Sequence, residues 1–234
     1  MLGNFLPNSG LGSWTMRKTL LAAAAAISLL AGASTASAAN FSFTGNFALD
    51  DDVQLFNFNV TSESMVTLRT LSYAGGLNAA GETIARGGFD PILILYDSAG
   101  NVIDWNDDPG PGVVPTDPTT NSYWDAFLTA LLAPGSYIVS LTQYDNFSSG
   151  TLADGFWREG EGNFTAYIGC PTGGPAFNDA SGQPGCARDS HWAVDVLNVA
   201  DASAVPVPEP ASLSLFGLGL LGLGFIRHRK ARQG

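Results

Sequence analysis

Short runs in which apolar and polar residues alternate dominate the middle of the chain. Residues 53–60 (VQLFNFNV) and 64–71 (SMVTLRTL) alternate with a period of two, and residues 92–96 (ILILY) form a short continuous apolar run. A period of two is typical of a strand that buries one face, and a short apolar run between turns is typical of a strand buried on both faces. The pattern therefore predicts β-structure.

Turn-forming residues separate these runs, at 98–101 (SAGN) and 133–136 (APGS). Only Tyr123–Leu132 has a pattern compatible with a helix, and further strands are predicted at 102–105, 137–144, 164–169 and 191–199. Short strands between turns favour an antiparallel sandwich. We predict an all-β domain over residues 40–204, an antiparallel β-sandwich of jelly-roll-like form.

A secretory signal peptide is predicted near the amino end. Residues 16–18 (MRK) are basic, residues 20–30 are apolar and residues 36–38 (ASA) are small, which is the order of a signal peptide and its cleavage site. The predicted signal peptide spans residues 16–39. Residues 1–15 have no place in this order, so we expect translation to start at Met16.

An apolar run near the carboxyl end predicts a transmembrane helix over residues 211–226. A span needs roughly 17–25 residues, so the run is at the short limit. The alternative is a buried core helix, but the four interleaved glycines would each cost about 1 kcal/mol there relative to alanine. Because Lys and Arg are retained on the cytoplasmic side, we expect the basic tail to lie there: Arg227, Arg229, Lys230 and Arg232.

The stretch before this run is Val207-Pro208-Glu209-Pro210. Its prolines remove backbone donors and keep the chain extended, in a form that a protease can thread. Together, the three parts resemble the PEP-CTERM sorting signal over residues 205–234. The resemblance implies an exosortase, a membrane-embedded cysteine protease, which cuts near this motif. It also implies a Gram-negative bacterium with an exopolysaccharide or biofilm system, and an inner-membrane-anchored precursor that ends at the cell surface or in the extracellular matrix.

Between its two ends the chain is strongly acidic. It carries 20 of the 21 acidic residues there, no lysine, and four arginines: Arg69, Arg86, Arg158 and Arg188. The resulting net charge of about −16 repels nucleic acid and anionic lipid and attracts cations. We therefore expect no nucleic-acid partner.

Two cysteines, Cys170 and Cys186, enclose a loop rich in proline and glycine. In the oxidising compartment that a signal peptide implies, we expect a disulfide between them. A closed loop of ~15 residues corresponds to roughly 3 kcal/mol of stabilisation. A metal pair is the alternative, but it lacks a second C-x-x-C motif or a histidine partner.

Three stretches of the body, DDDVQLFNFNV, FDPILILYDSAGNVIDWNDD and LLAPGSYIVSLTQYD, are followed by HWAVDVLNV. In this order they resemble the family known as DVUA0089, which is similar to bacterial pre-peptidase C-terminal domains. The resemblance supports calcium bound where the DDD and NDD loops converge at one end of the sandwich, because Ca²⁺ takes six to eight oxygen ligands from such loops. The predicted ligands are Asp51, Asp52, Asp107 and Asp108. The alternative is that acidic loops only keep an exported protein soluble.

Catalytic motifs are absent from the sequence, which has no G-x-S-x-G, H-E-x-x-H or G-x-x-x-x-G-K pattern. His191, the single histidine of the predicted domain, lies beside an apolar strand. Several aromatic residues lie near predicted loops, where they could stack on sugars, although most aromatic side chains fill cores. Trp105 and Trp157 are the least core-like of them and are the candidate glycan contacts.

Three functions stay open. We expect an exported, non-catalytic protein of the cell surface or biofilm matrix, structural or adhesive. The alternative is a carbohydrate-binding module whose loops are ordered by calcium, with extracellular polysaccharide as its partner. A polysaccharide hydrolase is the third, because among 20 acidic residues some pair will lie at a catalytic separation by chance.

Overall fold

The computed structural model describes residues 37–167, 176–179 and 188–206 of the 234-residue chain. By its internal contacts the chain divides into residues 1–36 and residues 37–234, and all described residues belong to the second unit. Four predicted features lie wholly or largely outside the described residues: the signal peptide, the Cys170–Cys186 disulfide, the sorting motif at 207–210, and the transmembrane helix with its basic tail. Within the described ranges, no helix is long and apolar enough to cross a membrane.

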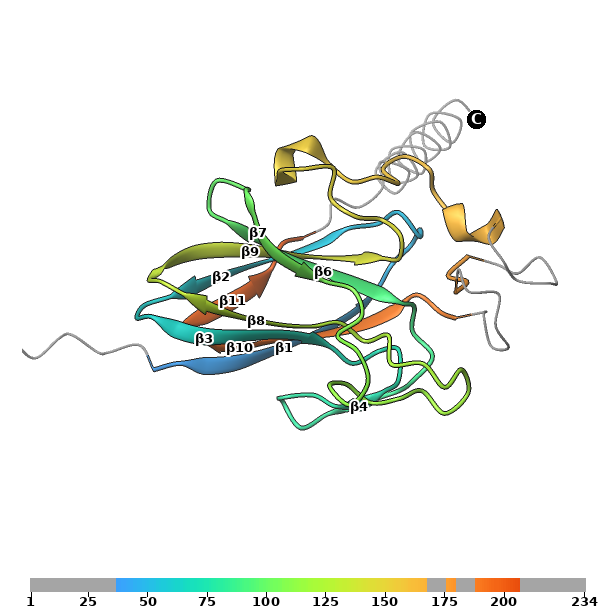
Figure 1. The fold of residues 1–234 in the computed structure, drawn as a ribbon, viewed down its shortest axis with the longest axis horizontal. Helices are drawn as coiled ribbons and strands as arrows, with labels where there is room; N and C mark the ends of the chain where they lie inside the picture. Colours follow the sequence, from blue (N-terminus) through green and yellow to red (C-terminus); the bar gives the residue numbers. More distant parts are fainter. Residues whose placement is uncertain (1–36, 168–175, 180–187, 207–234) are drawn as a thin grey trace, which may run out of the picture. The chain divides into compact units, whose positions relative to one another are not determined.

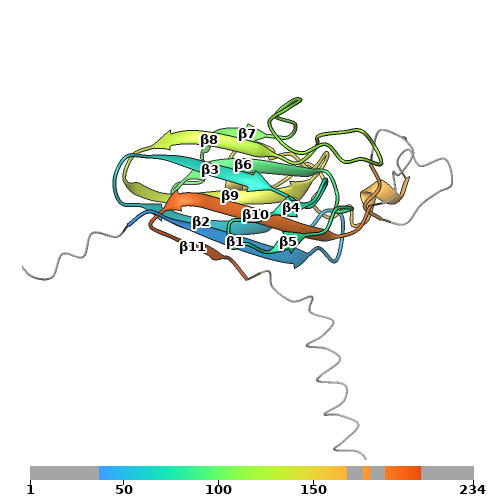
Figure 2. The ribbon, with the colours of Figure 1, turned by 90° about the horizontal axis from the view of Figure 1, so that it is seen from below.

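Two antiparallel sheets face each other, as Figure 1 shows, and Figure 2 gives the same layers from below. The first sheet has the order β1 (Ala39–Asn46), β10 (His191–Val199), β3 (Ser64–Thr70), β8 (Phe127–Leu132). The second has the order β11 (Asp201–Ala204), β2 (Gln54–Val60), β9 (Gly135–Gln143), β6 (Pro91–Asp97), β7 (Val102–Asn106). A separate pair joins β4 (Gly76–Leu77) and β5 (Thr83–Ile84).

Most consecutive strands of this fold belong to opposite sheets, and β6–β7 is a hairpin within one sheet. That path is the jelly-roll arrangement, in which two sheets share one core. The predicted all-β antiparallel sandwich is therefore confirmed. At the sides of the sandwich, β7 lies next to β8 and β1 lies next to β11.

The apolar run of β6 is buried on both of its faces. Leu93 and Leu95 point into the core between the sheets. Ile92, Ile94 and Tyr96 form a second, outer cluster, which is covered by side chains of the chain after β9, including Phe147, Leu152 and Phe156. Because both faces need apolar side chains, this strand shows no alternation, whereas β2 buries Phe56 and Phe58 and exposes Asn57 between them.

A close approach between β1 and β10 gives the first prediction. Gly45 is paired with Trp192, and a Cβ atom at Gly45 would overlap the indole ring of that buried tryptophan. We expect Gly45→Ala to destabilise the domain by about 1–3 kcal/mol, as overpacked cores do. Gly135→Ala is the control, because the nearest atoms to its Cβ would lie at 3.5 Å. Urea unfolding measures both; equal stability of the two variants would contradict the packing described.

Two sequence predictions of secondary structure are wrong. Residues 164–169 were expected to form a strand, but Phe164–Tyr167 is a short 3₁₀ helix, held where the Thr165 amide donates to the Asp50 carboxylate at 2.8 Å. The helix-compatible segment Tyr123–Leu132 instead contains β8, whose residues pair with β3 along its whole length. In both cases distant partners override the local preference of the chain. The strands β1, β4, β5 and β11 were not predicted from the sequence.

Candidate cation-binding site

Three carboxylates meet at one end of the β6–β7 hairpin. Asp90 directly precedes β6, and Asp107 and Asp108 directly follow β7. Because the two strands are antiparallel, the start of β6 and the end of β7 lie at the same end of the sheet. One carboxylate oxygen from each residue lies within 4.8 Å of the other two. Within the described part of the chain, this is the one group of three or more His, Cys, Asp or Glu side chains close enough to hold a metal ion.

The backbone around these carboxylates is held by neighbouring strands. Pro91 opens β6 with a fixed φ, and the Tyr144 amide at the end of β9 donates to the Asp90 carbonyl oxygen at 2.8 Å. At the end of β7, the Asn106 side-chain oxygen accepts from the Phe127 amide of β8 at 2.8 Å. The three acidic residues therefore extend from positions that hydrogen bonds to β8 and β9 keep in place.

Two of the carboxylate oxygens are buried without a partner. Asp90 is only 8% exposed, and its Oδ1 atom has no hydrogen-bond partner among the described residues. The same holds for Oδ1 of Asp107. Gln143, which is paired with Pro91 across β9 and β6, has a buried and similarly unpartnered Oε1. A buried oxygen without a hydrogen-bond donor lowers the stability of the folded state, and a bound cation would supply the missing partner.

The electrostatics of the cluster follow from burial and mutual repulsion. Burial, together with the charges of Asp108 and Asp145, raises the pKa of Asp107 to about 7. Burial raises the pKa of Asp108 to about 6. The pKa of Asp90 is raised well above its ordinary value, first by burial and then by the charges of Asp107 and Asp108. Without a cation the cluster therefore retains protons near neutral pH, and metal binding would release them.

The nearby arginine is occupied by other carboxylates. Arg158 donates from Nε and Nη2 to the two oxygens of Asp145, at 2.9 and 3.0 Å, and it also pairs with Glu161 at 3.2 Å. Asp145 lies close enough to raise the pKa of Asp107. Among the described residues, the recorded ion pairs of Arg158 do not include any of the three clustered carboxylates. The positive charge of Arg158 is therefore paired with Asp145 and Glu161, and the three clustered carboxylates keep an excess of negative charge.

The structure brings together only half of the predicted ligand set. Asp107 and Asp108 lie in the cluster, whereas Asp51 and Asp52 do not. Asp51 Oδ2 accepts from the amides of Gly160 and Gly162, at 3.0 and 2.9 Å. Asp52 Oδ2 accepts from two amides in the preceding turn, at 2.6 and 2.9 Å. These two carboxylates therefore stabilise loops, and the third carboxylate of the cluster is Asp90.

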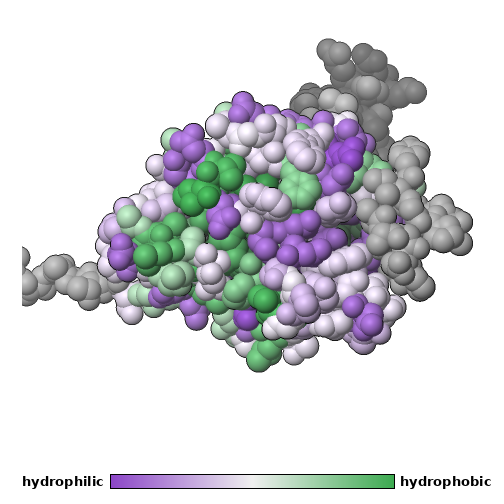
Figure 3. All heavy atoms as spheres, viewed as in Figure 1, coloured by the Kyte–Doolittle hydropathy of each residue, from purple (hydrophilic) through white to green (hydrophobic). Residues whose placement is uncertain are grey.

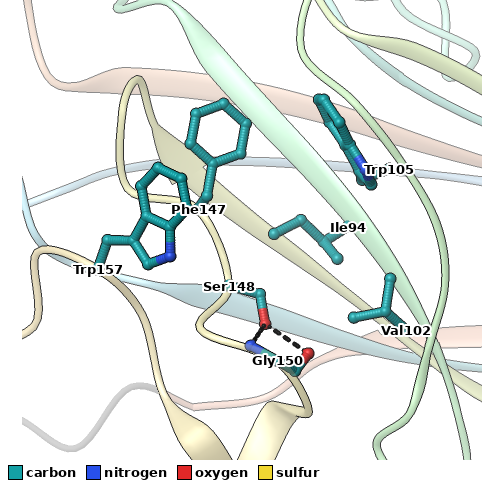
Figure 4. A pocket seen from close by; sticks show the side chains of 7 residues that line it. All are labelled: Ile94, Val102, Trp105, Phe147, Ser148, Gly150 and Trp157. Carbon is teal, nitrogen blue, oxygen red and sulfur yellow. Dashed lines mark hydrogen bonds between the residues drawn. The ribbon is translucent and has the colours of Figure 1, made fainter.

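Trp105 and Trp157 lie on the surface, as the sequence analysis expected. They are 54% and 59% exposed, whereas Tyr73, another aromatic residue near a predicted loop, is fully buried. Both tryptophans contact Phe147, with ring centroids 5.5 and 5.1 Å apart. Together they border a groove of about 350 Å³ on the outer side of β6 and β7 (Figure 4). Their contact with glycan stays a prediction.

Comparison with known proteins identifies a sorting signal near the C-terminal end of the chain. Residues 206–230 match the PEP-CTERM protein-sorting motif. This motif implies an exported protein whose precursor is anchored in a membrane and which an exosortase processes. No curated protein matches the chain.

Solved structures similar to the chain include the pre-peptidase C-terminal domain of a collagenase from Bacillus anthracis. The two chains share 10% identity over 70% of this chain and 90% of that one, with a TM-score of 0.32. A similarity of this size carries no argument about function. Membership of the DVUA0089 family stays a prediction. The family match therefore concerns only residues 206–230, near the C-terminal end of the chain, and not the β-sandwich.

Proposed function

We propose that the protein is an exported, non-catalytic component of the cell surface or extracellular matrix, structural or adhesive, whose sandwich binds Ca²⁺ at Asp90, Asp107 and Asp108. The sorting motif supports the export. The observation that supports the ion is the convergence of three carboxylate oxygens within 4.8 Å, two of the residues having a buried oxygen without a partner.

The donor set suits calcium. Ca²⁺ is a hard cation that takes oxygen ligands in flexible geometry, and carboxylates from separate segments with added water commonly complete its shell. Extracellular calcium modules typically have Kd values of about 10⁻⁴–10⁻³ M, so such a site fills after export. There the ion would join the two ends of the β6–β7 hairpin and offset the repulsion between its carboxylates. Its role is then to stabilise the domain at one end of the second sheet.

A polysaccharide hydrolase is the second candidate. A carboxylic acid with a pKa of about 7, beside another carboxylate, is what a glycosidase uses as its general acid. A bound cation would displace that proton, so the two roles of Asp107 exclude each other. If the hydrolase were correct, the protein would cleave a polysaccharide when calcium is removed by chelator, and Asp107→Asn would not; we expect no cleavage by either protein.

Calcium titration of the purified protein tests the proposal. At about 100 times Kd, a ligand specific for the folded state adds ≈ 2.7 kcal/mol, which for a domain of this size raises Tm by roughly 5–10 °C. Calorimetry should show one site, and Asp90→Asn and Asp107→Asn should lose both the heat and the rise in Tm. Asp104→Asn is the matched control, since Asp104 is an exposed acid on β7, the strand that Asp107 and Asp108 follow.

The stability of the variants without calcium shows whether they are folded. Without calcium at pH 7.5, Asp107→Asn should be at least as stable as the original protein, because it removes a buried charge that lacks a partner. Loss of calcium binding in a variant that unfolds at the normal temperature therefore reflects the site itself. An equal rise in Tm for Asp107→Asn and Asp104→Asn would refute the proposed site.

A further inference from the structure

The aromatic groove lies on the outer side of the β6–β7 hairpin. Trp105 and Val102 of β7 form one side, Phe147 and Trp157 from the chain after β9 form the other, and Ile94 of β6 lies between them (Figure 4). Figure 3 shows apolar residues gathering over this hairpin. The volume of the groove, about 350 Å³, is at the lower end of the range for small-molecule sites, ≈ 300–1,000 Å³. The groove is therefore large enough to hold part of a ligand.

The two indole rings are fixed by their contacts with Phe147. The interplanar angle to Phe147 is 84° for Trp105 and 55° for Trp157, so neither indole is stacked flat on the central ring. The Trp157 amide also donates to the Phe147 carbonyl oxygen at 2.9 Å. More than half of each tryptophan remains exposed. Exposed aromatic surface held in one arrangement is typical of a binding site.

The polar groups of the groove are few and uncharged. Ser148 Oγ donates to the Gly150 carbonyl oxygen at 3.0 Å and accepts from the Gly150 amide at 3.3 Å. None of the seven residues that line the groove carries a charge, although the body has a net charge of about −16. An anionic polymer would be repelled by that field and would find no cationic partner in the groove. A neutral ligand meets neither obstacle.

The aromatic faces select among neutral ligands. The face of an indole ring is the negative side of its quadrupole, so it attracts groups with a positive partial charge. The C–H face of a pyranose ring has such a charge and is also flat and weakly hydrated. The hydroxyl groups at the sugar's rim can meanwhile reach Ser148, Gly150 and water.

We propose that this groove binds a neutral polysaccharide, with pyranose rings against Trp105 and Trp157. A neutral polysaccharide is then the class of ligand for the adhesive role proposed above, and the inference rests on that role. It does not rest on the calcium ion. Phe147 acts as a positioning residue, since it contacts both tryptophans.

Affinity electrophoresis with soluble neutral polysaccharides (a β-glucan, a mannan and a galactan) tests the proposal, with a polyuronate as the anionic comparison. We expect retardation by at least one neutral polymer and not by the polyuronate. Trp105→Ala and Trp157→Ala should each weaken the binding at least tenfold. Leu131→Ala is the control, because Leu131 is 61% exposed on β8 of the other sheet.

Three results of the binding experiment would overturn the inference: no retardation by any of the neutral polymers, equal binding by the tryptophan variants and the control, or tighter binding of the polyuronate. A fourth comes from the oligomeric state. A concentration-dependent dimer that Trp157→Ala abolishes would also overturn it, since the groove would then join two copies of the chain. Calcium titration of the same variants separates this failure from that of the proposed function. If calcium binds normally while glycan does not, the groove inference alone is lost.

Discussion

Replacing Arg188 by methionine is expected to destabilise the domain by about 3–5 kcal/mol, the cost of breaking a buried ion pair by removing one partner. The Arg188 side chain is 4% exposed and lies 3.6 Å from the buried carboxylate of Asp117. Its Nε and Nη2 atoms donate to the carbonyl oxygens of Gly88 and Tyr73, at 2.8 and 2.5 Å. Its guanidinium also lies 3.7 Å from the centre of the Tyr73 ring.

Arg188 acts on several buried groups at once. Burial would raise the pKa of Asp117, but the amides of Thr120 and Thr119 and the charges of Arg188 and Arg86 outweigh it, so that the pKa is lowered. Without Arg188, the carboxylate of Asp117 would lose its buried cation and keep only the exposed Arg86 and two amides. The Gly88 carbonyl oxygen would lose the Arg188 donor, and the Tyr73 carbonyl oxygen would keep only the Gly87 amide. Weakening the compensation of a buried charge and removing donors from buried oxygens together is why a large effect is expected.

Arg86→Met is the matched control for this prediction. Arg86 pairs with the same carboxylate at 3.5 Å, but its side chain is 50% exposed. An ion pair of an exposed cation contributes about 0–1 kcal/mol, because solvent screens it. Urea unfolding of the two variants should therefore differ by at least 2 kcal/mol, about twice the upper value for an exposed pair. Equal stabilities would show that burial of Arg188 does not determine its contribution.

The second large effect is a loss of stability with rising pH when calcium is removed. In the folded state the pKa of Asp107 is raised to about 7, by burial first, and burial also raises the pKa of Asp108 and of Asp179 to about 6. In the unfolded chain these groups titrate near 3.9. Between those values the folded state binds more protons, so the free energy of unfolding falls as pH rises.

The decline that Asp107, Asp108 and Asp179 cause should begin above pH ~4 and end slightly above pH 7, and Asp90, whose pKa is raised well above its ordinary value, adds to it in the same direction. Each pKa unit corresponds to about 1.4 kcal/mol, so we expect a decline of several kcal/mol, to which the exposed Asp108 adds little because solvent screens it. Groups with lowered pKa values, Asp97, Asp117 and Asp154, act in the opposite sense but below about pH 4. They leave this window unchanged.

Urea unfolding at several pH values between 4.5 and 7.5, with chelator and with calcium, measures this effect. With chelator, stability should fall across the series; with calcium, the ion replaces the protons of the cluster, and only the part of the decline that Asp179 causes should remain. Asp107→Asn should flatten the curve measured with chelator. Stability that rises from pH 4.5 to 7.5 with chelator would contradict the pKa values of the cluster.

The strands were predictable where the local pattern agreed with the tertiary partner. β2 and β3 bury alternate residues, and the continuous run of β6 is buried on both faces, so pattern and burial coincide there. β8 was missed because its pairing with β3 determines its conformation. The strand expected at 164–169 failed because Thr165 is fixed by Asp50, a residue 115 positions away.

The candidate site was predictable in part. Asp107 and Asp108 were recognised from the acidic end of the hairpin, and the same hairpin places Asp90 beside them because the ends of antiparallel strands meet. That signal was present in the sequence and was not used. The role of Asp51 was out of reach, because its carboxylate accepts from amides more than 100 residues along the chain. Asp52, by contrast, accepts from amides only three and four residues before it, so its role is local. The exposure of Trp105 and Trp157 followed from their polar neighbours in the sequence.

A crystal structure of the protein grown at pH 7.5 with about 10 mM calcium, well above the Kd usual for extracellular modules, is the most direct test of the cation site. We expect one ion with oxygens of Asp90, Asp107 and Asp108 at about 2.3–2.6 Å from it. An ion held by Asp51 and Asp52 instead, or three carboxyl groups hydrogen-bonded to one another at that calcium concentration, would contradict it.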